Sequence, residues 1–183
     1  MRIDITLEIT ANMMKGESEA KAPLGHTGTH FDVMEKEFPL DYTRREGVVL
    51  DVSHVKDRDI DVCDADLSAI GKDMFVMFYT GYIETVGYAE KGYFTDHPQL
   101  SDALIGMLLE KGVSLIGVDF AGIRRGKEHI PKDRYCADRN VFVIENLCGL
   151  KAVLDAGGRA LFHTYPMRFA GMTGLPCRVI AEI

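Results

Sequence analysis

Near its start the chain carries the stretch Gly25-His26-Thr27-Gly28-Thr29-His30-Phe31-Asp32, which places two imidazoles and a carboxylate within seven positions. His26 and His30 converge on one point if the backbone coils there, whereas His30 and Asp32 share a face if it is extended. A tight glycine-bearing turn that runs into a strand satisfies both conditions. Neutral imidazole and carboxylate are suitable ligands for zinc, manganese or ferrous iron. The stretch therefore predicts a metal site; the alternative is three ordinary polar residues in a loop.

The composition around this stretch is typical of a globular protein: 183 residues, 46% hydrophobic and 27% charged. This length fits one domain spanning 1–183. No apolar run is long enough to cross a bilayer, and the N-terminus has no signal-peptide pattern, so we expect a cytoplasmic protein with no membrane partner. The formal net charge of −7 gives little support to a nucleic-acid partner.

The four cysteines form no C-x-x-C pair and are scattered along the chain. This spacing favours small buried side chains in a reducing compartment over disulfides. A nucleophilic cysteine has little support, because no candidate base lies near one in sequence.

Hydrophobic patterning predicts a mixed α/β domain in which strands outnumber helices. Alternating or continuously apolar segments predict strands at 3–9, 47–53, 74–79, 113–118, 141–144, 160–165 and 177–183. The stretch 74–79 is apolar throughout, so we expect it to be buried on both faces. Helix start and stop signals predict helices at 64–71, 101–111 and 150–156.

Three other segments lack a clear period. Residues 10–24 predict a loop, which could cover a site or simply connect two elements. The aromatic segment 82–94 could wall a pocket or pack in the core. Segment 120–138 is polar and basic, and includes Arg124 and Arg125, which could bind a substrate carboxylate or be solvated surface side chains.

Glu145 directly follows the apolar strand predicted at 141–144. A carboxylate at such a position is costly to bury unless it is paired or bound to a metal. Glu145 could therefore join the cluster of His26, His30 and Asp32. The alternative is a strand-end glutamate that reaches solvent or caps a backbone amide.

These residues together resemble the cyclase superfamily, which includes bacterial kynurenine formamidases and isatin hydrolases. The stretch 25–32 is similar to the H-x-G-T-H-x-D motif of that family. Further similarities, which extend over nearly the whole chain, are Thr80-Gly81, the G-x-D ending of 115–119, the E-N-L of 143–147 and the closing segment 167–183. The resemblance implies metal-dependent amide hydrolysis, a mixed-sheet swivelling β/β/α fold, one or two divalent ions and a homo-oligomer, a dimer or tetramer.

The resemblance also implies a ligand set. His26, His30 and Asp32 match the ligands of the first motif, Asp32 would bridge two ions, and Glu145 matches the ligand of the late strand. The family places a further histidine upstream of that glutamate, and Asp133 occupies the matching position here. An aspartate there favours harder ions such as manganese or magnesium over zinc. His129, four residues earlier, is the rival ligand.

A second departure affects the proton donor. The family motif continues as D-x-P-x-H, and its last histidine is the proposed acid/base group, whereas this chain has Asp32-Val33-Met34-Glu35-Lys36. Lys36 stands in the histidine position. A lysine beside a dication would have a lowered pKa and could move a proton near neutral pH. The alternative is that Lys36 pairs with Glu35 or Glu37 on a solvated turn.

Two functions remain open from the sequence. The first is a metal-dependent hydrolase of a small N-formyl, aryl-formamide or cyclic amide, with zinc or manganese as cofactor and Lys36 as catalytic residue. The second is a non-catalytic metal- and ligand-binding protein on the same scaffold, which has lost the acid/base histidine.

Overall fold

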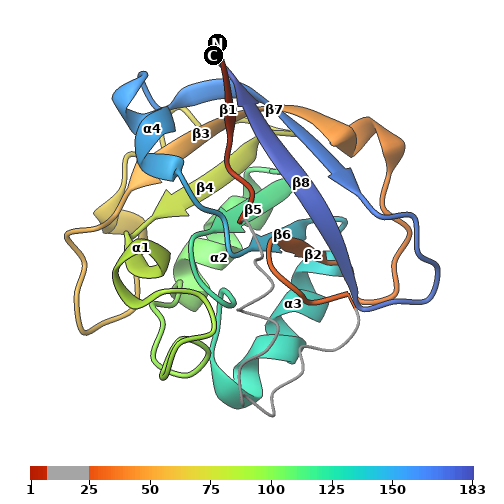
Figure 1. Cartoon of the computed structure of the whole chain (residues 1–183), viewed down its shortest axis with the longest axis horizontal. Helices are drawn as coiled ribbons and strands as arrows, with labels where there is room; N and C mark the ends of the chain where they lie inside the picture. Colours follow the sequence, from red (N-terminus) through yellow and green to blue (C-terminus); the bar gives the residue numbers. More distant parts are fainter. Residues whose placement is uncertain (8–24) are drawn as a thin grey trace.

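The computed structural model describes residues 1–7 and 25–183, and it contains both strands and helices (Figure 1). The strands are β1 (Arg2–Asp4), β2 (His30–Asp32), β3 (Arg44–Asp51), β4 (Phe75–Tyr79), β5 (Leu115–Val118), β6 (Phe142–Glu145), β7 (Arg159–Pro166) and β8 (Gly174–Glu182). The helices are α1 (Tyr82–Val86), α2 (Asp102–Glu110), α3 (His129–Ala137) and α4 (Leu150–Asp155), with short 3-10 turns at Leu40–Thr43, Val62–Asp64 and Gly126–Glu128.

The strands form one mixed sheet that closes on itself. Its order is β1-β8-β2-β6-β5-β4-β3-β7, and β7 also pairs with β8, so that every strand except β1 belongs to a ring. Strands β3 to β6 run parallel to one another, whereas β2, β7 and β8 make antiparallel pairs. The two chain ends lie together (Figure 1), where the N-terminal amine of Met1 donates to the carbonyl oxygen of Ile183 at 2.7 Å.

Two apolar cores lie on opposite faces of the central strands. On β4, Phe75 and Met77 belong to a core shared with β2, β6 and β8, whereas Val76 and Phe78 pack with residues of α2. Since successive side chains of a strand point to opposite faces, both faces of β4 must be apolar to be buried. This burial confirms the prediction from the continuously apolar stretch 74–79.

The mixed α/β fold is confirmed, and strands are found in each of the seven predicted segments, within the described residues. The loop expected at 10–24 and the end of the strand expected at 3–9 lie outside those residues.

Among the described helices, none is long and apolar enough to cross a membrane.

The helix predicted at 64–71 is wrong. Asp64 ends a 3-10 turn instead of starting a helix, because its carboxylate accepts a hydrogen bond from the backbone N–H of Asp61 and pairs with Arg58 at 2.6 Å. The following segment then runs without helix and buries Leu67 and Ile70 in the core.

The cysteines follow their prediction in part. All four are free; Cys136 and Cys177 are buried and Cys148 is partly buried, but Cys63 is exposed.

Candidate metal centre

The loop that carries His26 packs closely against the start of β8. A Cβ atom on Gly25 would lie 2.3 Å from the carbonyl oxygen of Gly174, and a Cβ on Gly174 would lie 2.7 Å from the His26 ring. Gly25 also has φ +108°, a region that L-residues with side chains rarely adopt. Glycine at both positions therefore lets the imidazole of His26 lie directly against the β8 backbone.

His30 and Asp32 occupy alternate positions of β2, so their side chains point to the same face. Strand β2 is antiparallel to β6, and His30 is the register partner of Glu145. The structure thus brings Glu145 to the first motif, with 3.5 Å between His30 Nε2 and Glu145 Oε2. His30, Asp32 and Glu145 are all buried.

Helix α3 supplies two more groups from its first turn and the next. His129 and Asp133 are four residues apart and therefore share one face of the helix. His129 Nε2 lies 2.9 Å from Glu145 Oε1 and 3.1 Å from Asp133 Oδ2. His129 and Asp133 were alternative candidates for one ligand position. Both side chains lie in the cluster, because one helical turn separates them.

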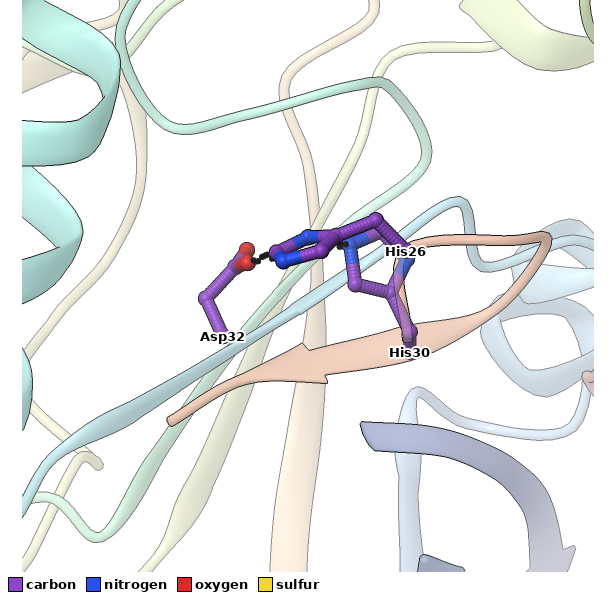
Figure 2. Close-up of side chains that lie close together, drawn as sticks. All are labelled: His26, His30 and Asp32. Atoms are coloured by element: carbon purple, nitrogen blue, oxygen red, sulfur yellow. Dashed lines mark hydrogen bonds and ion pairs between the residues drawn. The ribbon is translucent and has the colours of Figure 1, made fainter. Parts of the chain in front are cut away.

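The three groups of the first motif converge (Figure 2). His26 Nδ1 lies 3.1 Å from His30 Nε2 and 3.1 Å from Asp32 Oδ1, and His30 Nε2 lies 3.7 Å from that same oxygen. The ligand atoms form two groups, each with all its atoms within 4.8 Å of one another. One group is His26, His30 and Asp32; the other is Asp32, His129, Asp133 and Glu145.

Two buried carboxylates in this cluster lack hydrogen bonds. Neither oxygen of Asp32 or of Asp133 accepts a hydrogen bond from the described residues, although both side chains are about 1% exposed. His26 Nδ1 and His129 Nε2 lie near these oxygens without hydrogen-bond geometry. A buried anion without partners is costly unless a cation compensates it, so the residues present fit a divalent ion.

The carboxylates also perturb one another. Burial raises the pKa of Asp133 to about 7, and the nearby charge of Asp32 adds to this rise. Burial and the Asp32 charge likewise raise the pKa of Glu145 well above its usual value. Burial alone would lower the pKa of His129, but the Asp133 and Glu145 carboxylates beside its Nε2 outweigh burial and raise the pKa to about 11. Without a metal, the cluster therefore holds more protons than isolated side chains would at neutral pH.

Hydrogen bonds outside the cluster orient both imidazoles of the first motif. His30 Nδ1 lies 2.9 Å from the carbonyl oxygen of Gly28, which can only accept, so His30 carries its proton on Nδ1 and presents the lone pair of Nε2. His26 Nε2 lies 2.9 Å from Thr173 Oγ1, and its Nδ1 faces the cluster. Such outer partners fix the ring orientation of metal-binding histidines.

The aromatic segment 82–94 supports the backbone at Gly28 through hydrogen bonds. The Gly28 N–H donates to the Tyr88 hydroxyl at 2.9 Å, and the Gly28 carbonyl accepts from Asn146 Nδ2 at 2.9 Å. Tyr93 is fully buried and donates to Asn146 Oδ1 at 2.7 Å. Of the two roles open for this segment, core packing describes Tyr93, and the structure adds a role in supporting the histidine loop.

The chain leaves the cluster through a tight turn. The Lys36 N–H donates to the Val33 carbonyl at 2.9 Å, and the two central residues, Met34 and Glu35, have φ +47° and +68°. Positive φ at both central positions is typical of a type I′ turn. Proline is held near φ −65°, so the proline of the family motif could not replace Met34 in this turn.

Lys36 follows this turn and is half exposed. Its Nζ lies 2.7 Å from Asp138 Oδ1 at the end of α3, and not at Glu35 or Glu37. It also lines a groove of about 960 Å³ between segments 35–43 and 165–171, together with Phe38, Leu40, Tyr165 and Phe169. None of the residues that line this groove belongs to the metal cluster.

The two arginines suggested for substrate binding differ. Arg124 is engaged by Asp59 at 2.6 Å and by Glu128 at 2.5 Å, and its side chain is only 12% exposed. The Arg125 side chain makes no ion pair with the described residues, while its backbone N–H donates to Gln99. Of these two arginines, Arg125 is thus the one whose guanidinium is available to bind a carboxylate.

Sequence reasoning missed the supporting residues Thr173, Tyr88 and Asn146. Asn146 stands next to Glu145 in the E-N-L stretch, which was a usable signal. Nothing in the pattern around Thr173 pointed to His26, because the two residues meet only through the pairing of β2 with β8.

Solved structures with this fold carry related names. A potential metal-dependent hydrolase with cyclase activity is 23% identical, with a TM-score of 0.76, over 99% of this chain and 96% of its own. A predicted metal-dependent hydrolase from Bacillus stearothermophilus is 22% identical, with a TM-score of 0.74, over 99% and 97%. Isatin hydrolase A from Labrenzia aggregata, bound to benzyl benzoate, is 18% identical, with a TM-score of 0.75, over 99% and 93%.

At these identities the structural similarity establishes the fold alone. No match is found among curated proteins. The sequence model of one family, described as putative cyclase, matches residues 3–124, which is more than half of the chain. The protein therefore belongs to the cyclase family.

Proposed function

We propose that this protein is a metal-dependent hydrolase of a small amide, with a divalent ion held by His26, His30, Asp32, Asp133 and Glu145. The observation that carries the proposal is the pair of buried carboxylates, Asp32 and Asp133, which lie beside three imidazoles and whose oxygens accept no hydrogen bond from residues 1–7 and 25–183. The names of the structural neighbours, metal-dependent hydrolase and isatin hydrolase, support the same reaction class.

When bound, a divalent ion such as zinc or manganese would polarise a carbonyl oxygen and lower the pKa of a water molecule to about 7. The residues of the chain prepare the site for it. The Gly28 carbonyl fixes the tautomer of His30, Thr173 orients His26, and Asp32 and Glu145 are buried beside them.

The leaving group of an amide needs a proton, and Lys36 is the proposed donor, with His129 as the second candidate. Asp138 Oδ1 lies 2.7 Å from Lys36 Nζ, which holds that side chain close to the end of α3. His129 Nε2 lies in the cluster itself, against Glu145 and Asp133. Arg125 is the proposed contact for a substrate that carries a carboxylate.

One observation favours a second function, a metal- and ligand-binding protein without catalysis. The acid/base histidine of the family is absent, and Lys36 is engaged in an ion pair on an exposed turn. A protein that binds ligand beside a metal but has no proton donor would bind amides without hydrolysing them.

Metal analysis and turnover together test the proposal. Asp32→Ala should abolish bound metal, and both Asp32→Ala and His26→Ala should abolish hydrolysis of formyl-kynurenine, isatin or simple lactams, assayed with zinc and with manganese. His163→Ala is the matched control, because His163 pairs with Glu182 away from the cluster. Full activity in a metal-free preparation would exclude the hydrolase proposal, and tight binding of an amide without turnover would favour the second function.

We further propose a homo-oligomer, which the resemblance to the family supports, and a cytoplasmic location. Sedimentation of the purified protein tests the first point, and fractionation of cells that express it tests the second.

A further inference from the structure

The two donor groups that meet at Asp32 differ in chemistry. The imidazole-rich group, His26, His30 and Asp32, offers two nitrogens and one carboxylate. The carboxylate-rich group, Asp32, His129, Asp133 and Glu145, offers three carboxylates and a single nitrogen. Asp32 is common to both, and both of its oxygens are free of hydrogen bonds, so each group can draw on it.

Asp133 distinguishes the second group. Its side chain is fully buried, neither oxygen accepts a hydrogen bond, and it lies on the face of α3 that carries His129. His129 Nε2, 3.1 Å from Asp133 Oδ2, is its nearest partner, and no lysine or arginine pairs with it among the described residues. A buried aspartate with one imidazole beside it, in a cluster of three carboxylates, favours the binding of a further cation.

Donor type decides which cation suits each group. Imidazole suits zinc, whereas carboxylate oxygens suit magnesium and manganese. Zinc binds most sites of mixed nitrogen and oxygen donors more tightly than manganese does, but this advantage shrinks as nitrogen donors are replaced by carboxylates.

We infer that the protein binds two unlike ions, zinc in the imidazole-rich group and a hard ion such as manganese in the carboxylate-rich group, and that Asp133 sets this difference. The inference rests on the proposed metal dependence and goes beyond it, because it assigns a different ion class to each group. With two equivalents of zinc and an excess of manganese, each chain should hold one ion of each kind.

The experiment measures metal content and needs no substrate. Metal-free protein is given two equivalents of zinc and a hundredfold excess of manganese, and then desalted. Native mass spectrometry and elemental analysis count the ions, and electron paramagnetic resonance measures the manganese affinity. The wild type should retain one zinc and one manganese, and His26→Ala should lose the zinc but keep the manganese.

Two variants of Asp133 test its role. Asp133→His should weaken manganese binding at least tenfold while a second zinc now binds, and Asp133→Asn should weaken manganese binding without that gain. Asp102→His is the matched control, since Asp102 is an exposed aspartate that pairs with Lys132. Circular dichroism of each variant checks that the fold is intact; because Asp133→Asn keeps the side-chain shape, it serves as the test if Asp133→His does not fold.

The outcomes separate this inference from the proposed function. Two zinc ions and no manganese in the wild type, or unchanged manganese affinity in Asp133→Asn, would overturn the assignment of unlike ions while leaving metal dependence intact. A protein that binds neither ion would overturn both.

Discussion

His30 lies directly opposite Glu145 in the ladder between β2 and β6, and their side chains approach to 3.5 Å between Nε2 and Oε2. Paired residues of antiparallel strands point to the same face, so this register places a ligand from residue 30 beside one from residue 145. A shift of one residue would send one of them to the opposite face.

The Glu145→Gln variant tests this relationship. It keeps the shape of the side chain but removes a charge from the cluster, so we expect metal affinity to fall by at least tenfold, a loss of about 1.4 kcal/mol. Isothermal titration with manganese measures the affinity. Glu182→Gln changes a glutamate at the chain end and should have no effect; equal affinities in wild type and Glu145→Gln would exclude Glu145 as a ligand.

The Gly25→Ala variant tests the close approach of the histidine loop to β8. The new Cβ would lie 2.3 Å from the Gly174 carbonyl oxygen, so the loop must shift and His26 with it. Gly157→Ala has a similar φ, +110°, but open space around the new Cβ, so it measures backbone strain alone, about 1–2 kcal/mol. We expect Gly25→Ala to lower the free energy of unfolding by more than this control, and to weaken metal binding at least tenfold. If urea denaturation shows the same loss of unfolding free energy in Gly25→Ala and Gly157→Ala, the steric clash at Gly25 is contradicted.

Asp119 should make the stability of the protein depend on pH. Burial raises its pKa to about 6 from 3.8, although Thr80 and the Gly81 N–H donate to its carboxylate. Between these values the folded state holds a proton that the unfolded chain has lost. The contribution of Asp119 to the free energy of unfolding is therefore full below pH 4 and is lost as the pH rises through 6, by about 3 kcal/mol at most.

Urea denaturation at pH 4 and at pH 7 checks this expectation by comparing the wild type with Asp119→Asn. The wild type should lose more unfolding free energy between the two pH values than the variant does. Parallel pH profiles would show that Asp119 does not titrate in this range.

Lys36→Ala tests the proposed proton donor. Its exposed ion pair with Asp138 should contribute no more than about 1 kcal/mol to stability, so the variant should fold normally and keep its metal. If Lys36 donates the proton, kcat should fall by about 10²-fold or more. An unchanged kcat and pH profile would move the role to His129, for which His129→Gln is the companion variant.

The sequence predicted the parts of the fold whose pattern reflects local burial. The apolar run that became β4 is one example, and the Ser101 cap that starts α2 is another, since the Ser101 hydroxyl accepts from the Leu104 N–H at 3.0 Å. Helix α3 could not be predicted from apolar periodicity, because its buried residues are Asp133, Cys136 and Ala137. Its buried face carries a carboxylate of the cluster where an ordinary helix would carry leucine.

The candidate site was predictable where a motif is continuous in sequence, as with His26, His30 and Asp32. The resemblance pointed to Glu145 and Asp133, and the structure brings both to the cluster. The turn after Asp32 was not predictable, because Met34 and Glu35 are not residues that favour positive φ. That turn determines the position of Lys36. The ion pair between Lys36 and Asp138, at the end of α3, could be found only from the tertiary structure.

The pairing of β2 with both β6 and β8 constrains the order in which the molecule can fold. His30 lies between Glu145 on one side and Pro176 on the other, so β2 lacks at least one of its neighbours until β8 has been synthesised. Contacts of such long sequence separation form slowly. A nascent chain that stops before Gly174 should therefore fail to capture metal, even though it already contains every proposed ligand.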